Sequence, residues 1–185
     1  MRLKRSLSGE QDTIRRFLAV LGGGSIALSN RLHATPEFFI SAHSFIRGYI
    51  EDGFFRKEEL LIKALDEVGF ANESAPVEAM RAEQVKSRET GVNLLEATKR
   101  WQSGDENARA EVGWNASEYS LIVRQHLDRL KNLILPLLEQ NLSHDDEHAL
   151  GDRLGTMPID EPLTDSTGTF ITLIEKLEED LADWD

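Results

Sequence analysis

The chain of 185 residues contains no cysteine. A chain without thiols forms no disulfide and no cysteine-ligated zinc or iron–sulfur centre, and it has no cysteine nucleophile. Long hydrophobic runs are missing as well. No stretch approaches the roughly 18 apolar residues of a membrane span, and no apolar region follows the basic N-terminus as in a secretory signal. These absences predict a cytoplasmic protein that does not associate with membranes.

Positive charge is also scarce, since 21 Lys and Arg stand against 33 Asp and Glu and give a formal net charge of -12. Such an acidic surface argues against binding to nucleic acid or to an anionic membrane. The length and the 40% hydrophobic content suffice for one packed core. We therefore expect a single acidic domain over residues 1–185.

The alternation of apolar and polar residues that indicates strands is almost absent, and no internal repeat is visible. Apolar residues recur instead at helical spacing. Helices are predicted at about 8–21, 36–68, 75–102, from a start between 105 and 117 to about 141, after Ser143, and at 170–181. The run Gly22-Gly23-Gly24 is expected to end the first helix as a linker, and 155–168 is expected to be a loop. The fold class is all-α.

Four long helices with one apolar face each pack most simply as an up-down four-helix bundle, here over about 8–142. Residues 143–185 then form a C-terminal extension, whose last helix carries Phe170, Ile174, Leu177, Leu181 and Trp184 on one face. That face either docks on the chain's own bundle, which is the commoner outcome, or pairs with a second subunit in a homo-oligomer.

Histidine is the side chain that most often carries chemistry in helical bundles, and the chain has 5 of them. His33, His144 and His148 fall in polar segments and are expected to be solvated, whereas His43 is expected to be hydrogen-bonded or half-exposed. Neither a nucleophile elbow, a His-Glu-x-x-His motif nor a phosphate-binding loop is present. No catalytic residue is therefore predicted, and the protein is expected not to be an enzyme.

Four segments in order resemble the hemerythrin-like (HHE cation-binding) domains, over roughly residues 8–150. They are Glu10-Gln11, then Phe54-Phe55-Arg56-Lys57-Glu58-Glu59 leading to Gly69, then Glu83-Gln84 with Arg88, and finally His126-Leu127-Asp128-Arg129-Leu130. In the family these segments carry Glu-His, His-His-x-Lys-Glu-Glu, Glu-His-x-x-x-Arg and His-x-x-x-Glu motifs. The resemblance implies a four-helix bundle whose inward side chains hold a pair of iron atoms, in some members for oxygen binding or iron sensing.

Most of the ligands that this resemblance implies are replaced. The corresponding places are Gln11, Phe54, Glu58, Gln84, His126 and Leu130, with Phe55 beside Phe54. Only Glu58 and His126 are still ligand types. A register shifted by one residue in the second helix places Gly53 or Arg56 at a ligand position and still supplies no histidine.

Two donors are too few for a two-metal centre, so no metal and no cofactor is expected. Phenylalanine and leucine at these places predict a filled core, in which Gln11 and Gln84 are satisfied by hydrogen bonds. If Glu58 and His126 are both buried, a hydrogen bond between them is expected. The charged run 57–59 can be interpreted in two ways. Glu58 belongs to the altered metal site, or the run is a solvated helix face in which Glu59 pairs with Lys63.

The leading hypothesis is therefore a non-catalytic, hemerythrin-like bundle that has lost its diiron site and acts as a binding or regulatory module. Its partner would be another protein or a small apolar ligand held between the helices. The alternative is an iron-binding protein with a reduced ligand set, in which Glu58 and His126 are helped by Glu10, Glu83 or Asp128 and serve oxygen or iron binding or sensing.

Overall fold

The computed structural model describes residues 2–30, 33–72, 74–159 and 169–184, and every regular element in them is helical. The elements are α1 (Arg2–Ser29), α2 (Pro36–Phe45), η1 (Ile46–Phe54), α3 (Phe55–Glu67), α4 (Ala75–Gln102), α5 (Ala108–Arg129), η2 (Leu130–Ile134), α6 (Leu135–Asn141), α7 (His144–Thr156) and α8 (Phe170–Asp183). The all-α prediction is confirmed. In the described part of the chain, no helix combines the length and apolarity needed to cross a membrane.

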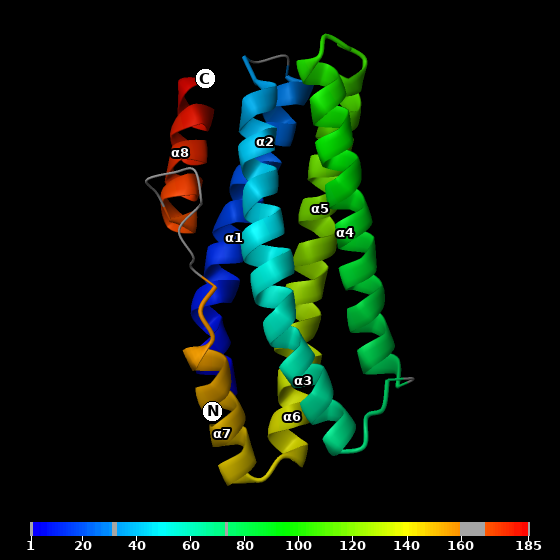
Figure 1. The fold of residues 1–185 in the computed structure, drawn as a ribbon, viewed down its shortest axis with the longest axis vertical. Helices are drawn as coiled ribbons and strands as arrows, with labels where there is room; N and C mark the ends of the chain where they lie inside the picture. The colour runs from blue at the N-terminus through cyan, green and yellow to red at the C-terminus, as the bar shows by residue number, and fades with distance from the viewer. Residues whose placement is uncertain (1, 31–32, 73, 160–168, 185) are drawn as a thin grey trace.

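The long helices lie side by side along the long axis of the molecule (Figure 1). The segment predicted at 36–68 is one continuous rod made of α2, η1 and α3, and α5, η2 and α6 form a second rod. In each rod a π-helical stretch, with hydrogen bonds five residues apart, replaces the α-helical pattern. The N–H of Phe55 thus bonds the carbonyl of Ile50, and the N–H of Leu135 bonds that of Leu130. The second stretch lies just before Pro136, which cannot donate a backbone hydrogen bond.

The first helix differs from its prediction at both ends, because α1 begins at Arg2 and continues through Gly22-Gly23-Gly24 to Ser29. The linker interpretation of this glycine run is wrong. A Cβ on Gly24 would lie 2.5 Å from Phe38 Cε1, and one on Gly23 would lie 2.9 Å from Leu181 Cδ1. The glycines therefore let α2 and α8 pack closely on α1, and this burial outweighs their low helix propensity.

The C-terminal extension packs on the outside of the long helices. Helix α7 begins after Ser143, whose side chain accepts a hydrogen bond from the backbone N–H of Asp146, and it lies against α1. It extends to Thr156, past the predicted start of the loop at 155, and the rest of that loop lies largely outside the described residues. Helix α8 docks on α1 and α2, so its apolar face is used within the chain.

The core is rich in aromatic rings that join helices far apart in sequence. Phe45 stacks on Phe17 at 4.2 Å and on Tyr49 at 4.7 Å between ring centroids, and it meets Phe170 of α8 in a T-shaped contact. Phe38 packs against Trp184 at 4.8 Å. These contacts tie α1, α2, η1 and α8 into a single core, in agreement with the expected docking of the last helix on its own bundle.

Candidate functional site

The site is centred on His126, which α5 places in the interior with only 1% of its surface exposed. Its Nε2 lies 2.8 Å and 2.9 Å from the two carboxylate oxygens of Glu58 on α3. Its Nδ1 lies 2.9 Å from Glu83 Oε2 on α4. The hydrogen bond between Glu58 and His126 that the sequence predicts for a buried pair is present, and Glu83 adds a second carboxylate on the opposite side of the ring.

Two further side chains extend this network to its ends. Within the core, the amide of Gln84 donates a hydrogen bond to Glu58 Oε2 at 2.5 Å. Toward the surface, Arg129 Nε donates to Glu83 Oε1 at 2.9 Å, and the Arg129 side chain is 37% exposed. The result is a chain of hydrogen bonds, running from buried Gln84 through His126 to the surface, in which every linking side chain has partners on both sides.

The charge state of this network follows from its geometry. Burial by itself lowers the pKa of His126, but the carboxylates, Glu58 above all, outweigh it and raise that pKa to about 10. The pKa of Glu83 is lowered because hydrogen bonds from His126 and Arg129 outweigh the effect of its partial burial. At neutral pH the imidazole is therefore protonated, and both of its N–H groups donate to carboxylates.

The other positions that were compared with metal ligands of the resembled family lie in the interior as well. Gln11 is 7% exposed, Gln84 2%, and Phe54, Phe55 and Leu130 are at most 2% exposed. Phe54 is the last residue of η1, Leu130 is the first residue of η2, and the ring of Phe55 meets the imidazole of His126 edge to face at 5.5 Å. The predicted filled core is confirmed at Phe54, Phe55 and Leu130.

The solvated interpretation of the run 57–59 is correct only for Glu59. Lys57 is buried and forms an ion pair with Glu10 of α1, and Glu58 is buried in the network. Glu59 is exposed, but it pairs with Arg81 of α4 and not with Lys63. The expectation was wrong for Lys57 because α1 supplies a carboxylate to a lysine that local sequence spacing leaves without a partner.

The donor set does not fit the pair of iron ions that the resemblance implies. Phe54 and Leu130 have no donor atoms, the amide of Gln84 is engaged with Glu58, and both ring nitrogens of His126 are engaged with carboxylates. In the described ranges, no group of three or more His, Cys, Asp or Glu side chains is arranged to hold a metal ion. As arranged, the residues form a buried ionic network.

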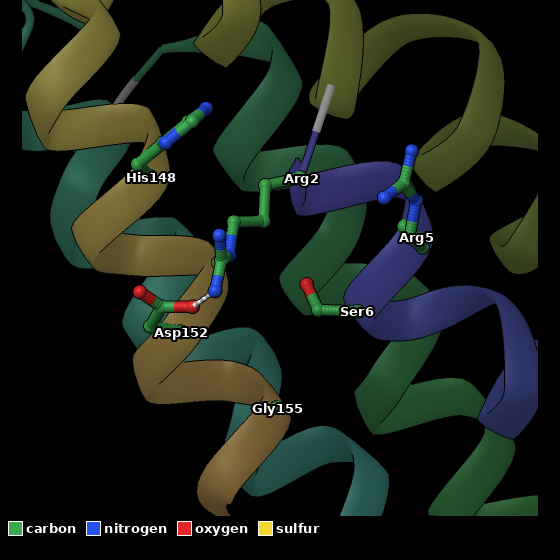
Figure 2. A pocket seen from close by; sticks show the side chains of 7 residues that line it. Arg2, Arg5, Ser6, His148, Asp152 and Gly155 are labelled. Atoms are coloured by element: carbon green, nitrogen blue, oxygen red, sulfur yellow. Dashed lines mark ion pairs between the residues drawn. The ribbon is translucent and has the colours of Figure 1, made fainter.

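Two cavities in the described part of the chain lie away from this network. One of about 560 Å³ lies between α1 and α7 and is lined by Arg2, Arg5, Ser6, His148 and Asp152 beside two glycines. Figure 2 shows Arg2 reaching from α1 to an ion pair with Asp152 on α7. Another, of about 670 Å³, lies between α1 and α5 beside exposed Trp114.

Comparison of the chain with protein-family models, with curated proteins and with solved structures finds no match in any of the three. The residues of the chain itself therefore carry the functional argument.

Sequence reasoning missed two partners in the network and one helix contact. From the sequence, Glu83 is considered only as an additional metal ligand, and Arg129 is assigned no role in the site. Both are charged side chains that lie, with His126, on facing helices. The capping role of Glu147 was also missed. This α7 carboxylate, 7% exposed, accepts the backbone N–H groups of Arg2 and Leu3 at 2.7 and 2.8 Å, which ties α7 to the start of α1.

Proposed function

We propose that the chain is a hemerythrin-like, up-down four-helix bundle that has lost its diiron site and acts, without catalysis, as a binding or regulatory module. The observation that carries this proposal is the set of hydrogen-bond partners around His126. Its two ring nitrogens face the carboxylates of Glu58 and Glu83, and apolar Phe54 and Leu130 occupy places that hold metal ligands in the resembled family.

The helix contacts support the bundle part of the proposal. Helix α1 packs on α5, α5 on α4, α4 on α2, and α2 on α1, which is a closed ring of neighbours. In Figure 1, the chain ascends in α1, descends through α2 and α3, ascends in α4 and descends through α5 and α6. This alternation of direction is what an up-down bundle requires.

The ionic network supports the loss of metal function, because it takes over the structural task of a metal centre. A cationic imidazole between two carboxylates joins α3, α4 and α5 through hydrogen bonds of the protein alone. The partner of the module would be another protein or a small apolar ligand.

The test is the metal content of untagged protein, expressed in iron-supplemented medium and purified without chelators. We expect less than about 0.1 iron per chain and no absorption band in the near-ultraviolet or visible range beyond that of the aromatic side chains. One or two irons per chain, held tightly through dialysis, would overturn the proposal.

A second candidate, iron binding with a reduced ligand set, is favoured by one observation. Glu58 on α3 and Glu83 on α4 each lie within hydrogen-bonding distance of His126 on α5. A metal ion could take the place of the proton on one ring nitrogen, bound by that nitrogen and the carboxylate facing it, if His126 lost that proton on binding. This candidate predicts bound iron that disappears in His126→Ala, and the network proposal predicts none in either protein.

A further inference from the structure

Two histidines outside the core stand next to each other on one helix. His144 and His148 are four residues apart in α7 and therefore lie one turn apart on the same face. Their ring centroids are separated by 4.1 Å. Both are accessible, since His144 is exposed and the His148 side chain is 42% exposed.

Within the described part of the chain, the ring nitrogens of this histidine pair form no hydrogen bonds. In the described residues neither ring has a hydrogen-bond partner, and the recorded carboxylate contact is Glu147 Oε2, at 3.7 Å from His148 Nε2. That distance is too long for a hydrogen bond. Both imidazoles therefore have a lone pair to offer in their neutral form, in contrast to His126.

The electrostatic surroundings favour a cation. The first turn of α7 contains Asp145, Asp146 and Glu147, which offset the positive end of the helix dipole. Arg2 and Arg5 line a cavity with His148. The guanidinium of Arg2 is held by Asp152 one turn further along α7, and Arg5 lies on the far side of Arg2 from His148 (Figure 2). The hydrogen bond from the backbone of Asp146 to Ser143 fixes the helix start, so the two rings are held on an ordered backbone.

We propose that His144 and His148 chelate one divalent transition-metal ion, such as Zn²⁺ or Ni²⁺, at the surface, with water completing the coordination. Neutral imidazole nitrogens select this class of ion, whereas Ca²⁺ and Mg²⁺ require oxygen ligands. Because the two histidines are adjacent only when α7 is helical, binding is expected to stabilise the folded chain as well. The inference uses no residue of the core network and stands whether or not the proposed function holds.

The experiment is calorimetric titration of ZnCl₂ and NiCl₂ into untagged full-length protein at neutral pH, together with thermal unfolding with and without ZnCl₂. We expect one ion per chain with a micromolar dissociation constant and a rise in the unfolding temperature. His144→Gln and His148→Gln are each expected to weaken binding by more than about tenfold and to abolish that rise. The matched control is His33→Gln, which removes a solitary exposed histidine.

The outcomes separate this surface site from the core. Binding that is unchanged in His144→Gln or in His148→Gln, or no binding by the wild type, would overturn the inference. Binding lost in His126→Gln but kept in both α7 variants would place the ion in the core, and would overturn the inference and the proposed function together. Loss in the α7 variants alone, with MgCl₂ giving no heat in any protein, supports the surface chelate.

Discussion

Histidine is used in two opposite ways in this molecule, at His126 in the core and at His144 and His148 on α7. The core imidazole is buried, protonated, and held by a carboxylate at each nitrogen. The surface imidazoles are accessible, and their nitrogens form no hydrogen bonds with the described residues. A histidine therefore becomes a structural cation or a candidate metal ligand according to what its neighbours supply, and residue type alone does not decide between these roles.

The largest expected effect is on the core histidine. His126→Leu keeps the volume of the side chain but leaves the carboxylates of Glu58 and Glu83 without their shared cation. We expect a loss of about 3–5 kcal/mol in the free energy of unfolding, measured by urea denaturation. The double variant Glu58→Gln/His126→Leu should lose less than the sum of the two single variants. A loss below about 1 kcal/mol in His126→Leu would show that the network contributes little to stability.

The pH dependence of stability sharpens the same comparison. The pKa of His126 is about 10 in the folded protein, against about 6.5 for histidine in an unfolded chain. Its stabilising contribution is fully present below about pH 6.5 and is lost as the pH rises through about 10. We expect the free energy of unfolding of the wild type to fall between neutrality and pH 10, and the fall to be much smaller in His126→Leu. Parallel curves for the two proteins would contradict this assignment.

A smaller effect is expected for the capping carboxylate beside the surface pair. Glu147→Ala removes the acceptor of the Arg2 and Leu3 N–H groups, and the Leu3 hydrogen bond is buried. We expect a loss of about 1–3 kcal/mol in the free energy of unfolding and faster amide exchange at the start of α1. Asp145→Ala, in the same turn but exposed, serves as the control and should change stability by less than about 0.5 kcal/mol.

The smallest effect is expected for the surface histidines in the absence of metal. His144→Gln removes a ring that forms no hydrogen bond with the described residues, so stability should change by less than about 0.5 kcal/mol. Chemical denaturation in the presence of a chelator measures this value. A loss as large as that of His126→Leu would erase the difference between the two regions.

Several features could be predicted from the sequence because they depend on local pattern. Apolar residues at helical spacing indicated most of the helices, and Pro36, Ser74 and Ser143 indicated three helix starts that the structure confirms within one residue. The pairing of Glu58 with His126 was also predictable, because a buried carboxylate and a buried imidazole satisfy each other. That Phe54 and Leu130 offer no donor atom to a metal is likewise visible in the sequence alone.

Only the tertiary structure decided the remaining features, because each depends on a neighbour that is distant in sequence. The glycines of α1 stay helical because Phe38 and Leu181 pack against them, and Lys57 is buried because Glu10 pairs with it. His126 carries a charge because Glu58 above all, and Glu83 as well, face its ring nitrogens. Local propensity amounts to about 1 kcal/mol per residue, and burial or ion pairing at one contact is of similar or larger size. The sequence alone therefore determined most of the helices and the apolar residues at positions 54 and 130, and packing decided the charge and role of the buried polar side chains.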